Sequence, residues 1–404
     1  TKFRRWLTKL PIELALSEPH LCIYHAWYSF INGQQDAAEK SLQAVEQALD
    51  SGSEAQEDGT LTGSDRMRLK GRIAAVRAFM VSHRGDVPGI IQHASRALEY
   101  LPEQDRTWRS LSAIALGDAH GFKGNMTAAY EARFEALKAC KAAGDIYYVL
   151  LASVKLAITL RAQGQLQRTI EICQEQIQLA SENRLSQTSL VGLFLMIWSE
   201  VLTELNDLDG AIDRANEGTE LVERAMDMAL LGWGYMCLAR ILFSRGEFAG
   251  IKEDIDKIEN ISREYNVPTW ITDQMAAWQV RVWLAQGKLE AASQWATTRG
   301  LLAVERQSLP EPDFFKLMEY IVLARILIAQ ERLDEATGLL QPLLETAEAG
   351  DRTTRVIEIL NLQALAFQAG SDSARAMIAL EQALTLAEPE GFVRAFVDEG
   401  RPMA

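Results

Sequence analysis

The amino-acid sequence predicts an all-α protein, a right-handed superhelical solenoid of about nine antiparallel helix pairs with a period of about 40 residues. Three observations predict this class. Short turn-forming motifs recur every 39 to 44 residues after a first interval of 52. Small residues lie at fixed distances on both sides of each turn, and the residues between turns are apolar with helical spacing. Stacked pairs bury their apolar faces against each other, so residues 1–404 are expected to form one domain.

The turns separate the two helices of each predicted pair. A small or turn-prone residue at such a point ends one helix and lets the next one reverse direction. We expect the first helices of the pairs to line an inner, concave wall and the second helices to form the outer wall. The motifs are Asn32-Gly33-Gln34, Arg84-Gly85-Asp86, Lys123-Gly124-Asn125, Gln163-Gly164-Gln165, Asn206-Asp207, Arg245-Gly246-Glu247, Gln286-Gly287-Lys288, Glu331-Arg332 and Gly370-Ser371.

Small residues flank the turns because two antiparallel helices approach closely only where their contact residues are small. Seven residues before each turn the series reads Ala26, Ala78, Gly117, Ala157, Ser199, Ala239, Val280, Ala324 and Ala364. Five residues after each turn it reads Ala38, Ile90, Ala129, Thr169, Ala211, Ile251, Ala292, Ala336 and Ala376. Eight of the nine residues in the first series are Ala, Gly or Ser, and six of the nine in the second are Ala.

The first interval is longer because of an insertion at residues 51–64. This stretch contains one large apolar residue, Leu61, and is otherwise polar or small. It is predicted to be a mobile loop between the first two pairs.

Composition and charge exclude several classes of function. The chain has 41 basic and 55 acidic residues, a net charge of −14, and no run of Lys or Arg, so direct binding of nucleic acid is not expected. No apolar stretch is long enough to span a bilayer and no signal peptide is recognisable, which predicts a cytoplasmic protein without membrane contact. Four widely separated cysteines without a CxxC pair predict buried thiols in a reducing compartment. They are Cys22, Cys140, Cys173 and Cys237.

No catalytic or metal-binding constellation is recognisable. The five histidines have no ligand spacing, and neither a Gly-x-Ser-x-Gly elbow nor a phosphate-binding GxxxxGK[ST] motif occurs. We therefore predict no enzyme, no metal and no cofactor for this chain.

Candidate ligand-binding residues follow from the repeat register. The residue directly after each small residue of a first helix is expected to face the groove, and three consecutive pairs carry arginine there. Trp233 and Met236 are expected to share the face of Arg240 because they precede it by about two turns and one turn of the helix, respectively. The candidates are Trp27, Asp118, Glu200, Trp233, Met236, Arg240, Arg281 and Arg325.

Two interpretations of the arginines remain open. As a ladder along one wall, their planar guanidinium groups suit carboxylate, phosphate or vicinal hydroxyl groups of a ligand, and an aromatic plane beside them suits a sugar ring. Alternatively, they pair with acidic residues of neighbouring helices, such as Glu200 or Glu204, and Trp233 packs between repeats.

The frame of small residues and turns resembles the tetratricopeptide repeat, although that repeat has a period of about 34 residues. The two ends are more specific. Trp6–Pro11, Pro19-His20-Leu21, Ala26-Trp27 and Gly33 resemble the opening, and residues 387–400 the closing segment, of the repeat domain in MalT-like regulators. These are ATP-dependent LuxR-type transcriptional activators of bacteria.

The resemblance implies a sensor domain that binds a small-molecule inducer and self-associates. It also implies an ATP-binding module before this segment and a helix-turn-helix domain after it, so ATP and DNA binding are expected only in those parts. A different function remains open on the same sequence, namely a scaffold whose groove binds a peptide or a partner protein.

Overall fold

The computed structural model describes residues 18–31, 34–51, 62–265, 267–303, 314–400 and 403, and every regular element in these ranges is helical, which confirms the all-α prediction. The α-helices are α3 (Pro19–Ile31), α4 (Gln35–Ser51), α5 (Gly63–Ser82), α6 (Val87–Tyr100), α7 (Arg106–Phe122), α8 (Met126–Ala143), α9 (Ile146–Ala162), α10 (Leu166–Glu182), α11 (Ser189–Glu204), α12 (Leu208–Arg224), α13 (Met228–Arg245), α14 (Phe248–Glu264), α15 (Thr269–Ala285), α16 (Leu289–Thr298), α17 (Phe314–Ala329), α18 (Leu333–Ala349), α19 (Thr353–Ala369), α20 (Ser373–Ala387) and α21 (Arg394–Val397). Two short 3₁₀ helices, η1 (Leu301–Ala303) and η2 (Glu388–Glu390), follow α16 and α20.

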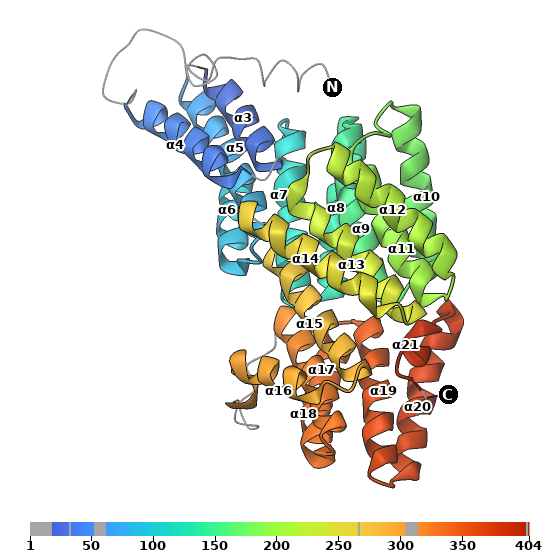
Figure 1. Ribbon diagram of the computed structural model, residues 1–404. Coiled ribbons are helices and arrows are strands. Elements are labelled where there is room, and N and C mark those ends of the chain that lie inside the picture. The colour runs from blue at the N-terminus through green and yellow to red at the C-terminus, as the bar shows by residue number, and fades with distance from the viewer. Residues whose placement is uncertain are drawn as a thin grey trace.

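Helices α3 to α20 follow one another as stacked pairs, which gives a tetratricopeptide-like solenoid (Figure 1). Every predicted turn from the second onward contains a residue with positive φ, which lets the chain reverse within a few residues. The handedness of the superhelix and the total number of pairs stay predictions, and residues 1–17 lie outside the described part. The turn residues with positive φ are Gly85, Gly124, Gly164, Asn206, Gly246, Gly287, Glu331 and Ser371.

The residues of both predicted series lie in the buried part of the solenoid. Within the first helices, Ala26, Ala78 and Ala157 are fully buried, and within the second helices Ala38 and Ala129 are too. The remaining members of both series are also buried. The pattern of small residues on both sides of each turn therefore corresponds to positions where the helices pack against one another.

Helix α5 begins inside the loop that the sequence predicts at residues 51–64, so this loop is shorter than predicted. Thr62 Oγ1 accepts a 3.1 Å hydrogen bond from the amide of Asp65, and the carboxylate of Asp65 accepts one of 3.1 Å from the amide of Thr62. This reciprocal capping satisfies two of the amides left over at a helix start, so the helix begins at Gly63. The expectation that the loop extends to Ser64 was wrong for this reason, and Ser51 already belongs to α4. Residues 52–61 lie outside the described part.

The solenoid returns onto itself, and its last helices contact its middle. In Figure 1 the red helices α19 to α21 lie beside green and yellow helices from the middle of the chain, and α19 contacts α9 while α21 contacts α11. The amide of Met126 donates a 2.9 Å hydrogen bond to the carbonyl of Gly350. A small apolar cluster forms across the same junction from Leu166, Val201, Ile357, Ala387 and Phe392.

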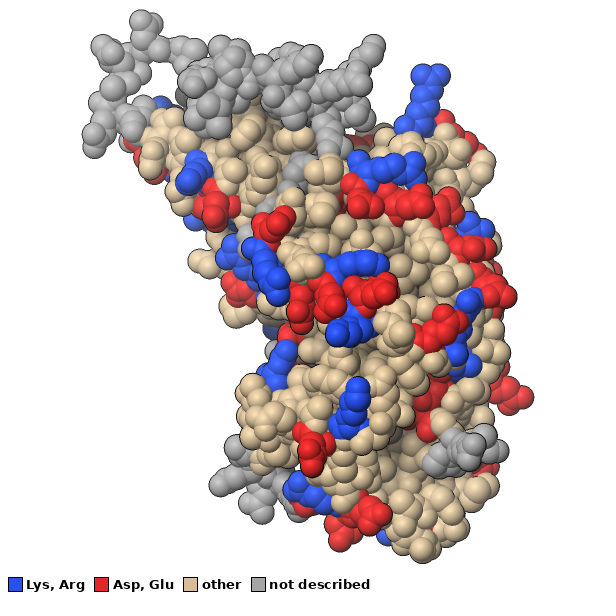
Figure 2. Space-filling model, viewed as in Figure 1, with Lys and Arg blue, Asp and Glu red and all other residues tan. Residues whose placement is uncertain are grey.

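The four cysteines are all buried and form no disulfide, as the sequence predicts. In the described ranges, no helix has the length and apolarity needed to cross a membrane. On the face in Figure 2, basic and acidic side chains are interspersed.

Candidate functional site: an arginine-rich inner cavity

A cavity of about 120 Å³ lies where the first helices converge. Apart from α21, every helix that lines this inner cavity is the first of its pair, namely α9, α11, α13, α15, α17 and α19. Residues 394–399 close the remaining side. These six first helices thus form an inner wall, as the register predicts, and the return of the solenoid onto itself covers part of it.

Five of the predicted candidates line this cavity and three do not. The five come from α11, α13, α15 and α17, which are consecutive first helices. They are Glu200, Met236, Arg240, Arg281 and Arg325.

Trp27 and Trp233 lie in the hydrophobic core instead. Trp27 packs edge-on against Phe79 with ring centroids 5.2 Å apart, and Trp233 packs edge-on against Trp270 at 5.5 Å. Their placement in the groove was wrong because their rings fill the space between adjacent pairs. For Trp233, this is the alternative that the sequence left open.

Asp118 belongs to a buried network of hydrogen bonds that lies outside the cavity. Its carboxylate accepts hydrogen bonds from Arg133 (2.6 Å), Lys155 (2.8 Å) and Ser82 (2.6 Å). Burial works to raise the pKa of Asp118, but Lys155 and Arg133 outweigh it and lower the pKa to about 2. The carboxylate therefore ties helices together and is not presented to the groove.

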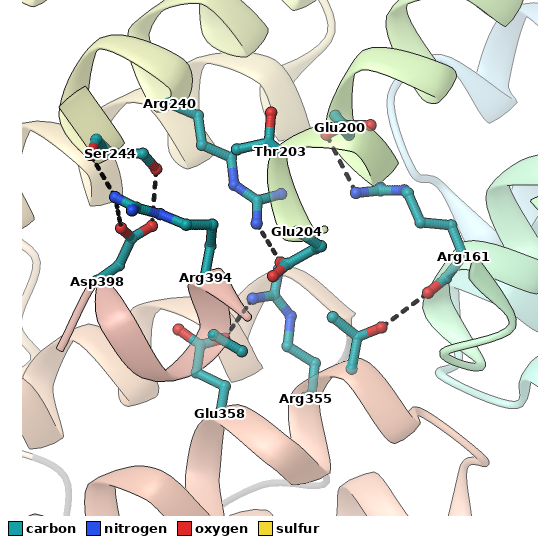
Figure 3. Close-up of polar contacts among 12 residues, drawn as sticks. Arg161, Glu200, Thr203, Glu204, Arg240, Ser244, Arg355, Glu358, Arg394 and Asp398 are labelled. Carbon is teal, nitrogen blue, oxygen red and sulfur yellow. Dashed lines mark hydrogen bonds and ion pairs between the residues drawn. The ribbon is translucent and has the colours of Figure 1, made fainter. Parts of the chain in front are cut away.

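Ion pairs between neighbouring helices organise one side of the cavity. Arg240 of α13 pairs with Glu204 of α11, and Arg161 of α9 pairs with Glu200 of α11 at 3.1 Å (Figure 3). Pairing of a predicted ladder arginine with Glu204 is the alternative that the sequence left open.

A second set of pairs lies around the other two ladder arginines. Glu399 pairs with both Arg281, at 3.4 Å, and Arg325. Arg325 also donates a 2.9 Å hydrogen bond to Glu358, which in turn pairs with Arg355 at 2.5 Å. Two carboxylates from the end of the solenoid therefore face a cluster of guanidinium groups.

Positive charge exceeds negative charge around the cavity. Seven arginines and five carboxylates line it, although the whole chain has a net charge of −14. Burial, followed by the charge of Arg325, lowers the pKa of Arg281 even though Glu399 opposes the change. Burial works to raise the pKa of Glu358, yet Arg355 and Arg325 hold it well below its usual range. Neighbouring guanidinium groups thus contribute to both shifts, after burial for Arg281 and against burial for Glu358.

Arg352 adds a buried charge that has no acidic partner in the described part of the chain. Its side chain is 2% exposed, and only Nη2 donates, over 3.0 Å, to the carbonyl of Thr346. Burial, followed by the charge of Arg355, lowers the pKa of Arg352 to about 10. A buried cation without a counter-charge strengthens the attraction of this region for anions.

Several buried polar atoms at the cavity have no hydrogen-bond partner among the described residues. Buried polar atoms are usually satisfied by protein, water or ligand. These atoms can therefore recognise polar groups of a molecule in the cavity. They include Oε2 of Glu200 and Glu204 and Nε of Arg161, Arg240, Arg325 and Arg394.

Trp278 supplies an aromatic plane that the sequence analysis missed. It lines the cavity, with the guanidinium carbon of Arg281 4.5 Å and that of Arg240 5.9 Å from its ring centroid. The sequence did contain a signal for Trp278, because it precedes Arg281 by one helical turn and so shares its face. Arg161 was missed as well, although it follows the small residue Ala157 by four residues, about one helical turn.

Residues from the last pairs gave no such signal, because they enter the cavity only through the return of the solenoid. These are Arg352, Arg355, Glu358, Arg394, Asp398 and Glu399. In the described ranges, no group of three or more His, Cys, Asp or Glu side chains is placed to hold a metal ion.

An all-helical solenoid whose first helices enclose a polar cavity defines a repeat protein of the tetratricopeptide class. The chain belongs to the family described as the MalT-like TPR region, which matches residues 71–404.

Curated relatives are similar over nearly the whole chain. The HTH-type transcriptional regulator MalT of Yersinia pestis (strain Pestoides F) is 27% identical over 407 residues, which cover 98% of this chain and 42% of the relative. The protein of the same description from Yersinia enterocolitica serotype O:8 is 26% identical with the same coverage. The chain thus spans less than half the length of these regulators.

Among solved structures, a Rap protein complexed with competence and sporulation factor has a TM-score of 0.65 and 13% identity. The similarity covers 93% of this chain and 99% of the Rap chain. At this identity it supports the fold alone.

Proposed function

We propose that this chain is the ligand-sensing and oligomerisation domain of a bacterial LuxR-family, MalT-like transcriptional activator, and that it binds a small-molecule inducer in the inner cavity. The observation that carries the proposal is the convergence of six first helices on one partly enclosed, charged cavity with unsatisfied polar atoms. Enclosed sites with a few convergent polar groups are typical of small-molecule binding.

A thermal-shift screen of the chain against a metabolite library tests the proposal. A bound ligand stabilises the folded state by mass action, by about 2.7 kcal/mol at a hundred times its Kd. We expect a selective hit whose effect is abolished by Arg281→Glu, because this change reverses a charge in the cavity. Arg263→Glu is the matched control, since Arg263 is exposed on α14 outside the cavity. A screen without any hit, or a hit that Arg281→Glu leaves unchanged, contradicts binding in the cavity.

A scaffold that binds a peptide or a partner protein is the second candidate. One observation favours it, namely that residues 394–399 of the chain itself already lie against the inner wall. The similar Rap protein was solved as a complex with a factor, which agrees with this candidate only at the level of the fold. A partner that binds the chain and is displaced by no small molecule would favour the scaffold.

Other parts of the regulator carry the remaining steps in this proposal. The acidic chain does not bind DNA itself, and ATP binding and DNA recognition belong to other modules, so the chain is a sensor without enzymatic activity or a cofactor of its own. Self-association remains part of the proposal, and sedimentation of the chain with and without the screened ligand tests it.

A further inference from the structure

The last segment of the described chain turns back into the inner cavity and places a carboxylate between two arginines. The side chain of Glu399 is 6% exposed and pairs with Arg281 of α15 and Arg325 of α17. Just before it, Asp398 pairs with Arg394 at 2.5 Å and accepts a 2.8 Å hydrogen bond from Ser244 of α13 (Figure 3). The chain therefore supplies its own anion to the predicted arginine ladder.

Polar contacts hold this segment together with partly buried apolar packing of Ala395 and Phe396. The amide of Val393 donates a 2.9 Å hydrogen bond to the carbonyl of Glu204, and Asn361 Nδ2 donates one of 2.9 Å to the carbonyl of Ala395. Val393 and Val397 are 37% and 53% exposed. The helix α21 has four residues, too few for stability of its own. Groups that compete for the polar contacts can therefore detach the segment.

Removing Glu399 would leave a strong positive site. Arg281 and Arg325 would then share Glu358 as their nearby carboxylate, and Glu358 also pairs with Arg355. A buried charge that loses its partner is destabilising. An anion from outside would replace the lost carboxylate, so Glu399 and such an anion compete for one place.

The small size of the cavity also indicates that residues 394–399 occupy space that a ligand would need. Sites that enclose a metabolite of drug size have volumes of about 300–1,000 Å³. The present cavity has about 120 Å³, and Arg394, Ala395, Asp398 and Glu399 form part of its wall. Withdrawal of this segment enlarges the space next to Trp278 and the arginines.

We infer that Arg281 and Arg325 form a subsite for the carboxylate or phosphate group of a ring-containing metabolite, that Glu399 occupies this subsite as an internal competitor, and that ligand binding releases residues 393–400. The inference rests on the proposed function and adds the charge of the ligand and the segment that responds to it. Guanidinium groups match the oxygens of carboxylate and phosphate, and the ring of Trp278 provides a stacking surface.

Calorimetric titration of the chain with four probes tests the competition. The probes are inorganic phosphate, succinate, glucose 6-phosphate and glucose. We expect at least one anionic probe to bind Glu399→Gln about tenfold more tightly than the wild type, because a competing charged contact is removed. The phosphate and succinate arms distinguish the two anion classes. Glu388→Gln is the matched control, since Glu388 is exposed and does not line the cavity.

Equal affinity of the anions for Glu399→Gln and wild type overturns the inference, and so does the absence of anion binding to both. Hydrogen exchange of the wild type gives a second readout that needs no variant. An anionic probe should increase exchange of the amides of residues 393–400, and glucose should not. A neutral hit that is sensitive to Arg281→Glu but leaves this exchange unchanged would retain the proposed function and reject the internal competitor.

Discussion

The carbonyl of Gly350 accepts a 2.9 Å hydrogen bond from the amide of Met126, although one residue precedes α19 and the other begins α8. Beside this contact, Arg352 lies against Gly124, and Thr354 donates a 2.7 Å hydrogen bond to the carbonyl of Arg161. These contacts join distant repeats and enclose the cavity. The closure of the solenoid, rather than any single helix, thus creates the candidate site.

Substitution of Gly124 tests this closure. Gly124 has a φ of +79°, and a methyl group there would lie 2.8 Å from Cζ of Arg352. Gly124→Ala is expected to lower the free energy of unfolding by about 2 kcal/mol or more, because it adds a steric clash to backbone strain. Gly144→Ala is the matched control, since Gly144 has a φ of +70° and nothing within 4 Å of the added methyl group. Urea denaturation measures both, and equal losses would contradict a role of Gly124 in closure.

Asp118 predicts a stability that depends on pH. Its pKa is lowered from 3.8 to about 2 in the folded chain. A lowered carboxyl pKa contributes stability above pH 3.8, and this contribution is lost as pH falls through about 2. The shift corresponds to roughly 2 kcal/mol. Asp118→Asn should therefore be less stable than wild type at pH 6, with a difference that shrinks on acidification.

Urea denaturation between pH 6 and pH 2.5 measures this difference. Asp209→Asn is the control, because Asp209 is 96% exposed in its pair with Arg245 and such pairs contribute little. A difference between Asp118→Asn and wild type that is independent of pH would refute the assigned shift.

The sequence predicted which residues of a first helix face the inner wall, but it did not predict that the last helices return to contact the middle of the solenoid. The sequence placed Arg240, Arg281 and Arg325 on one wall because each follows the position, Ala in two pairs and Val in the third, at which its helix packs against its neighbours. The same rule failed at Trp27, since the first pairs face only their neighbours and fill that space with aromatic rings. Arg352 and Glu399 reach the cavity through small rotations summed over many pairs, and no local pattern encodes that sum.

The buried thiols should be almost inert in the folded protein. Burial raises the pKa of Cys22 to about 11, and it raises those of Cys173 and Cys237 further. The thiolate is the reactive form, so at pH 8 a shift of this size slows reaction with Ellman's reagent about a hundredfold. Ile378→Cys, at a position that is 56% exposed, supplies a fast-reacting control. Rapid modification of the native cysteines without denaturant would contradict their burial.

Phe392 is expected to anchor the segment that enters the cavity. Its side chain is 6% exposed in the junction cluster with Leu166 and Val201. Phe392→Ala should cost about 3 kcal/mol, in keeping with losses for buried aromatic side chains. We expect most of this loss to be local, with faster hydrogen exchange in residues 392–400 and unchanged exchange in α5, because the distant pairs keep their own contacts. Leu386→Ala is the control, since Leu386 is 39% exposed. Uniformly faster exchange along the solenoid would instead mean that the junction stabilises all pairs together.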